Sequence, residues 1–242
     1  MKMSNTNPLQ RYEQVGVAMT CRSFAEYERM FDLDEELLSR GPILDVAAGA
    51  SSFTAEARSK GYEAMAVDPQ YALTRDELYA NGREEIEVST AKLAKLQHQY
   101  DWSFYGNIDL HKQGRLRSLE TFIADFNSVN GEKVYRNGRL PHLPLEESRY
   151  ALILCSHFLF LYHHQFNYEF HRDAVLGLLG LCRPGGEIRL YPVFTLSWVA
   201  YPCMERLLAD LHQAGAETAF LPSKLPFIPG SGELLQVVKQ AI

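Results

Sequence analysis

Short apolar runs alternate along the chain with longer segments in which apolar residues recur at helical spacing. Residues 150–156 are apolar almost throughout, which is typical of a central parallel strand that is covered on both faces. A loop rich in Pro and Gly joins the last two runs with no helix between them, and this predicts an antiparallel pair at one edge of a sheet. The predicted strands are residues 43–46, 63–68, 134–135, 150–156, 187–194, 217–221 and 233–239.

The segments between these runs carry helix signals. Ser23 followed three residues later by Glu26 is a capping box, so a helix is expected to begin at Phe24. Gly61 is the stop signal of a second helix, which follows the first strand and runs to Lys60. The other predicted helices are residues 34–39, 89–100, 116–129, 167–182 and 198–214.

Elements in this order predict an α/β fold with a doubly wound, mostly parallel sheet. The first strand, the tight loop, the helix and the second strand form one right-handed crossover unit. A length of 242 residues suits one domain better than two. We therefore expect a single domain over residues 1–242, with an N-terminal helical cap over 1–41. Residues 73–131 are longer than a plain crossover needs, which predicts a helical insertion there.

Composition narrows the class of partner. The net charge of −6 argues against broad binding of nucleic acid, which depends on clustered Lys and Arg. The four cysteines form no C-x-x-C pair, as expected for reduced, mostly buried thiols. Residues 1–7 are polar, and the apolar runs are too short to span a bilayer. These features predict a cytoplasmic protein without membrane insertion, and they leave the oligomeric state open.

The loop after the first strand is the candidate ligand site, because open α/β sheets bind ligands beyond the carboxyl ends of their strands. Asp45 lies inside this strand, and small residues follow it over 47–51. Asp68 ends the second strand, where a carboxylate is well placed to accept hydrogen bonds from both hydroxyls of a ribose. The alternative is that Asp68 is only a turn residue before Pro69. Since a carboxylate at a strand end carries little packing, its removal is expected to leave thermal stability nearly unchanged.

The sequence of residues 44–51, Leu-Asp-Val-Ala-Ala-Gly-Ala-Ser, resembles the first motif of class I methyltransferases that use S-adenosylmethionine (SAM). Residues 143–157 resemble the segment around the fourth strand of these enzymes, and 181–186 resemble the turn before the fifth. The resemblance covers most of residues 42–239. It implies a Rossmann-like sheet of seven strands in the order 3-2-1-4-5-7-6, with the seventh strand antiparallel, and SAM as the cofactor. The pieces 48–53, 156–162 and 168–171 are similar to an uncharacterised bacterial group of methyltransferase-like proteins.

Two departures from the family pattern concern the cofactor. Ala47 and Ser51 replace the outer glycines of a G-x-G-x-G motif, and Arg139 stands where an acidic residue often contacts adenine. The backbone of Leu140 is still expected to bond the adenine ring. The cofactor-binding residues that the resemblance implies are Tyr27, Asp45, Ala47, Ala48, Gly49, Ser51, Asp68, Pro69, Arg139, Leu140 and Ser156.

Methyl transfer is a direct displacement, so positioning does most of the work, and a base is needed only for an acceptor that loses a proton early. His157, just past the fourth strand, is the first candidate for a catalytic base or orienting group. Glu169 and His171, near the start of the next helix, are further catalytic candidates. The alternatives are a histidine bonded to a backbone carbonyl and a solvated helix start. The apolar run 158–162 is expected to form a wall of the cleft.

Other patterns carry weaker hypotheses. His157, His164 and His171 form no short metal-ligand motif, so no metal site is predicted. One set of aromatic residues suggests either a lid or core packing, and one set of basic residues suggests either a solvated surface or a site for an anionic acceptor. The aromatic set is Tyr12, Tyr27, Phe31, Trp102, Phe104 and Tyr105, and the basic set is Lys112, Arg115, Arg117, Lys133, Arg136 and Arg139.

These observations predict a SAM-dependent methyltransferase that acts on a small-molecule acceptor. An NAD-dependent dehydrogenase is a less favoured alternative, since its fingerprint would put glycines at positions 47, 49 and 52, and only Gly49 is present. A second alternative is a non-catalytic SAM-binding or regulatory protein that retains the fold.

Overall fold

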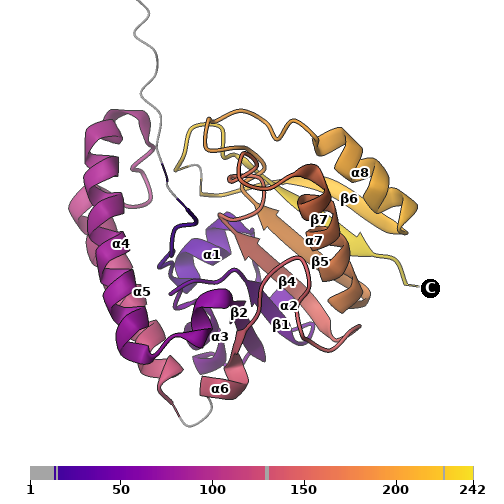
Figure 1. Ribbon diagram of the computed structural model, residues 1–242, viewed down its shortest axis with the longest axis horizontal. Helices are drawn as coiled ribbons and strands as arrows, with labels where there is room; N and C mark the ends of the chain where they lie inside the picture. Colours follow the sequence, from indigo (N-terminus) through magenta and orange to yellow (C-terminus); the bar gives the residue numbers. More distant parts are fainter. Residues whose placement is uncertain (1–13, 15, 129–130, 226, 242) are drawn as a thin grey trace, which may run out of the picture.

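A seven-stranded sheet runs through the centre of the computed structural model, which describes residues 14, 16–128, 131–225 and 227–241 (Figure 1). The strand order is β3-β2-β1-β4-β5-β7-β6, and β7 runs antiparallel to both of its neighbours. The predicted sheet order and fold class are thus confirmed. The strands are β1 (Ile43–Val46), β2 (Ala64–Asp68), β3 (Tyr135–Asn137), β4 (Tyr150–Ser156), β5 (Cys182–Tyr191), β6 (Ala216–Pro222) and β7 (Glu233–Lys239).

The register of the central strands brings three strand ends together. Val46 at the end of β1 pairs with Cys155 of β4 on one side and with Val67 of β2 on the other. All three strands are parallel, so the residues that follow them leave the sheet at the same edge. Every residue of β4 is buried, as its apolar sequence predicted.

Helices cover both faces of this sheet. In Figure 1, α4 and α5 lie side by side as a long pair beyond the β2 end, and α7 and α8 lie toward the β6 end. The core residues Leu78 of α4 and Phe122 of α5 belong to the same buried cluster as Ala66 of β2 and Tyr135 of β3. The helices are α1 (Phe24–Met30), α2 (Glu35–Leu38), α3 (Phe53–Ser59), α4 (Arg75–Leu96), α5 (Ile108–Phe126), α6 (Gly131–Val134), α7 (Tyr168–Leu181) and α8 (Met204–Gln213), with 3₁₀ turns η1 (Pro69–Ala72) and η2 (Gln97–Gln99).

Capping residues explain where the helices begin. The capping box of Ser23 and Glu26 forms as predicted, and α1 begins at Phe24. A second capping box, Thr74 with Glu77, starts α4 at Arg75, well before the predicted residue 89. Asn107 accepts a hydrogen bond from the backbone of Leu110 and starts α5 earlier than predicted. The insertion is therefore more helical than the apolar spacing indicated.

Two predicted boundaries near the C-terminus were wrong. β5 begins at Cys182 and ends at Tyr191, so the Arg-Pro-Gly-Gly segment is part of the strand and residues 192–194 are not. The last helix, α8, begins at Met204 rather than at residue 198. The segment between them forms a loop in which Trp198 has a φ of 58°. No helix among the described residues is long and apolar enough to cross a membrane.

Candidate active site

A cavity of ≈ 240 Å³ opens beyond the carboxyl ends of β1, β2 and β4, and we call it the first cavity. Its apolar surface includes Val67, Leu140 and Phe170, and its polar groups include Asp68 and Ser156. The predicted cofactor-binding residues that line it are Ala47, Asp68, Pro69, Arg139, Leu140 and Ser156.

Asp68 is both a turn residue and part of this cavity. Its Oδ1 accepts a hydrogen bond from the backbone N–H of Gln70 at 2.8 Å, and its Oδ2 accepts one from the N–H of Gly49 at 3.0 Å. Burial raises the pKa of the Asp68 carboxyl, while these two N–H groups and the charge of Arg139 oppose the rise. A carboxylate has about four acceptor sites, so each oxygen retains one for a ligand hydroxyl.

Other predicted cofactor residues lie beneath the cavity in a buried hydrogen-bonded cluster. The Tyr27 hydroxyl donates to the Asp45 carboxylate, whose two oxygens are each 3.1 Å away. It also lies 3.2 Å from the Ser156 hydroxyl and 3.5 Å from the Ser51 hydroxyl. Burial raises the pKa of Asp45 well above its usual value, with the Tyr27 hydrogen bond opposing and the charge of Asp68 adding to the rise. Tyr27, Asp45 and Ser51 are not among the residues that line the first cavity.

The loop after β1 is held by an N-terminal segment, residues 18–22. The N–H of Ala50 donates to Thr20 O at 2.9 Å, and the N–H of Ser52 donates to Arg22 O at 3.0 Å. These two backbone donors of the loop are therefore bonded within the chain. Gly49 has a φ of 58°, and a Cβ on it would lie 2.9 Å from Thr20 O. This glycine allows the 18–22 segment to pack directly against the loop.

Replacing Gly49 by Ala is expected to destabilise the protein. The left-handed backbone costs a non-glycine residue about 1–2 kcal/mol, and the contact with Thr20 O adds to that. The matched control is Gly114→Ala in α5, where a Cβ would have only Arg117 Nη2 within reach, at 4.0 Å. That substitution should stabilise the helix by about 0.5–1 kcal/mol. Urea unfolding of both variants measures the difference, and equal effects would contradict this explanation of Gly49.

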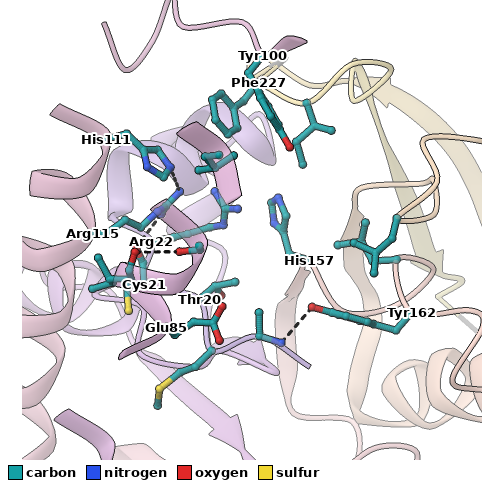
Figure 2. A pocket seen from close by; sticks show the side chains of 18 of the residues that line it. Thr20, Cys21, Arg22, Glu85, Tyr100, His111, Arg115, His157, Tyr162 and Phe227 are labelled. Carbon is teal, nitrogen blue, oxygen red and sulfur yellow. Dashed lines mark hydrogen bonds between the residues drawn. The ribbon is translucent and has the colours of Figure 1, made fainter. Parts of the chain in front are cut away.

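A second cavity, of ≈ 130 Å³, lies on the other side of the 18–22 segment, against α4, α5 and residues 227–228 (Figure 2). Ala18, Thr20 and His157 line both cavities, so they form the wall between them. Phe158 faces the first cavity, while Leu161 and Tyr162 face the second. The run 158–162 therefore contributes a wall to each cavity, in agreement with the prediction.

A buried ionic cluster forms one side of the second cavity, and the sequence analysis did not find it. Glu26 Oε1 lies 2.8 Å from Arg115 Nη1 and 3.3 Å from Arg22 Nη1. The Tyr105 hydroxyl donates to the same oxygen at 2.7 Å. Arg115 is only 8% exposed, so the solvated-surface interpretation of the basic set was wrong for this residue. The sequence does contain one indication of this cluster. Arg22 and Glu26 are four residues apart, as are His111 and Arg115, and side chains at this spacing are neighbours on a helix.

His157 occupies an unusual position at the end of β4. Its φ is 51°, and its N–H donates to Tyr191 O at 2.7 Å. The residue is 8% exposed, and its buried Nδ1 has no hydrogen-bond partner. Burial, with the charges of Arg22 and Arg115, lowers the pKa of His157 well below its usual value, so the imidazole is neutral. A left-handed non-glycine residue at a cavity wall is a form of backbone strain that clusters at functional sites.

The other two predicted catalytic residues lie elsewhere. Glu169 is exposed, and neither it nor His171 lines either cavity. His171 is buried, its Nδ1 lies 2.8 Å from Asn167 O, and its ring stacks on Phe160. The structure thus does not bring these two residues to His157. Among the described residues, no three His, Cys, Asp or Glu side chains are arranged to hold a metal ion.

The predicted aromatic set has mixed positions. Tyr27 and Phe31 are fully buried in the core, as the packing alternative stated. Trp102 and Tyr105 pack around Phe227, with ring centroids 5.2 Å and 4.8 Å from it. Tyr12 lies outside the described residues.

Comparison with known proteins supports the fold. No protein-family model matches the chain. The uncharacterised protein MJ0045 of Methanocaldococcus jannaschii is 35% identical over 190 residues, which cover 78% of this chain and 83% of that protein. The crystal structure of the glycopeptide N-methyltransferase MtfA complexed with SAM has a TM-score of 0.51 at 11% identity, covering 94% of this chain and 99% of that one.

SAM-bound CalS10, an amino pentose methyltransferase from Micromonospora echinaspora, has a TM-score of 0.51 at 11% identity and covers 88% of this chain and 91% of that one. At such low identity, the likeness to both structures concerns the fold alone. The chain therefore belongs to the same family as MJ0045, and it carries the fold of the class I SAM-dependent methyltransferase superfamily.

Proposed function

We propose that this protein is a SAM-dependent methyltransferase that acts on a small-molecule acceptor. The observation that carries the proposal is a pair of cavities that share one wall. The first lies at the carboxyl ends of β1, β2 and β4 with Asp68 in it, and the second lies beyond Thr20 and His157. A cofactor in one cavity and an acceptor in the other would meet at this wall.

The residues of the first cavity fit an adenosine group. Asp68 has acceptor sites free for two ribose hydroxyls. Val67 and Leu140 line the same cavity and supply apolar surface for a flat base. Arg139 is exposed and lines the cavity where the family often has an acidic adenine contact, so that contact is lost here or is supplied by another residue. Asp45, Tyr27 and Ser51 support the floor through their buried hydrogen bonds.

SAM, when bound, supplies a methyl group on a cationic sulfur, which keeps the electron pair of the breaking C–S bond while the acceptor's lone pair forms the new bond to carbon. Thr20 and His157 would hold the acceptor at the shared wall, and the apolar residues around them exclude water. Burial and the charges of Arg22 and Arg115 disfavour protonation of the neutral His157, so of its two predicted roles the proposal assigns it that of orienting the acceptor.

The proposal covers residues 1–242 as one methyltransferase domain that works in the cytoplasm. The cap over 1–41 and the insertion over 73–131 are proposed to contribute the acceptor side. In support, Arg22 of the cap and His111 and Arg115 of the insertion line the second cavity. The buried thiols of Cys21, Cys155 and Cys182 fit a reducing compartment.

Calorimetric titration with SAM, S-adenosylhomocysteine and NAD tests the proposal. We expect micromolar-range binding of SAM or S-adenosylhomocysteine and no comparable binding of NAD. Tighter binding of NAD than of SAM would overturn the proposal in favour of a dehydrogenase. Binding of SAM without methyl transfer to any member of a small-molecule acceptor panel would favour the non-catalytic alternative.

A further inference from the structure

We propose that the second cavity binds a small, ring-sized carboxylic acid, and that Arg22 and His111 hold its carboxylate. Identifying this acid as the methyl acceptor rests on the proposed function, whereas the binding of the acid does not. The inference is drawn from unpartnered buried donors, from the local charge and from the size of the cavity.

The first unpartnered donor is Arg22. Its guanidinium points into the second cavity toward His157 (Figure 2). The residue is 7% exposed, its Nη1 contacts Glu26, and its buried Nε has no hydrogen-bond partner. A buried donor without a partner is costly, and one on a charged group more so. An anionic ligand oxygen would satisfy it.

The second unpartnered donor is His111, in a fixed tautomer. Its Nε2 lies 3.1 Å from Arg115 Nη2, and because a guanidinium only donates, Nε2 is the acceptor. Burial and the charge of Arg115 lower the pKa of His111 to about 2, so the ring is neutral and Nδ1 carries the proton. This Nδ1 is buried and has no partner. The ring also stacks on Phe227, with centroids 5.4 Å apart, which fixes its orientation.

Two guanidinium groups share one carboxylate beside these donors, and this arrangement favours an anion. Arg22 and Arg115 both lie against one carboxylate, that of Glu26. Among the described residues, Glu85 on α4 is the acidic residue that lines the cavity itself, and no ion pair joins it to either guanidinium. Its buried Oε1 also lacks a partner, and burial raises its pKa, with Lys92 opposing and Glu84 adding to the rise. Glu85 is therefore suited to a hydroxyl or amino substituent of the acid rather than to its carboxylate.

The size and remaining walls of the cavity indicate a single ring. Its volume is ≈ 130 Å³, close to the engineered cavities of about 150 Å³ that hold benzene. Tyr100 and Phe227 form one end in Figure 2, and Leu161 and Trp198 add apolar surface. His157 and Thr20 lie at the wall shared with the first cavity, so the far side of a bound ring would face the cofactor.

The test is calorimetric titration of the full chain with benzoate, benzamide and benzylamine, without SAM. These probes share one ring and differ in charge, so we expect benzoate to bind at least about tenfold more tightly than either of the others. Equal or tighter binding of benzamide or benzylamine would overturn the proposal. Because no SAM is present, failure here is distinct from failure of the SAM titration.

Two variants locate the bound acid. Arg22→Met should weaken benzoate binding about tenfold or more, and Glu26 keeps its partner Arg115 in this variant. Arg58→Met removes a partly buried ion pair with Asp125 outside the cavity and should leave benzoate binding unchanged. Unchanged benzoate binding in Arg22→Met would contradict the site. Competition between benzoate and S-adenosylhomocysteine would place the acid in the first cavity and would also overturn the proposal.

Discussion

Replacing Asp68 by Ala should reduce the affinity for S-adenosylhomocysteine about ten- to a hundredfold or more. The carboxylate lines the first cavity and has acceptor sites left for two ribose hydroxyls. Each hydrogen bond to a charged group contributes about 1.5–3 kcal/mol, which corresponds to that range of affinity. Calorimetric titration of the variant and the parent protein gives the ratio directly.

The same substitution should also lower stability, which corrects the expectation from the sequence. Asp68 accepts hydrogen bonds from Gly49 and Gln70, so alanine leaves two backbone N–H groups without their partners. A buried unsatisfied donor costs about 1–3 kcal/mol. The control is Asp34→Ala, which removes the N-terminal cap of α2, a loss of about 1 kcal/mol, at a residue that does not line the cavity. If Asp68→Ala binds the ligand as well as Asp34→Ala does, Asp68 is a structural turn residue only.

The sheet was predictable from the sequence because strand burial leaves a local signal. β4 is buried on both faces, and its sequence is a continuous apolar run. In its described residues, the loop between β6 and β7 contains no helix that could form a crossover connection, so the two strands pair antiparallel. The start of α4 was missed because its apolar residues are sparse, although Thr74 and Glu77 mark it. The spacing of apolar residues is a weak signal in a helix that buries only one narrow stripe. The capping residues then indicate where the helix begins.

The first cavity was partly predictable and the second was not. Asp68, Ala47 and Ser156 follow parallel strands, and parallel strands end at one edge. Arg22, His111 and Glu85 come from segments far apart in the chain, and only tertiary packing brings them together. A basic residue on a polar helix is usually solvated, so burial of Arg115 could not be read from its neighbours.

Glu26→Gln is expected to produce the largest loss of stability. Glu26 is 4% exposed, and its carboxylate contacts Arg115 and Arg22 at 2.8 Å and 3.3 Å. Without its charge, two buried guanidinium groups face each other with no counter-ion. Breaking a buried ion pair by removing one partner costs about 3–5 kcal/mol. Urea unfolding at pH 6 measures the loss, and Glu63→Gln, which affects an exposed pair with Arg149, should cost no more than about 1 kcal/mol.

The pH dependence of this loss separates the charge of Glu26 from its packing. Burial alone would raise the pKa of the carboxyl, but the charges of Arg115 and Arg22 lower it from the usual 4.5 to about 2. Because the pKa is lower in the folded state, the ionised carboxylate stabilises that state at every pH above the pKa of the unfolded state. This contribution, about 3 kcal/mol, is lost as the pH falls from 4.5 toward 2. The difference between parent and Glu26→Gln should therefore be constant above pH 5 and shrink steadily below pH 4.5. A difference that stays the same at pH 3 would mean that glutamine disturbs the packing around Tyr105 and Ser23, and that the ion pairs contribute little.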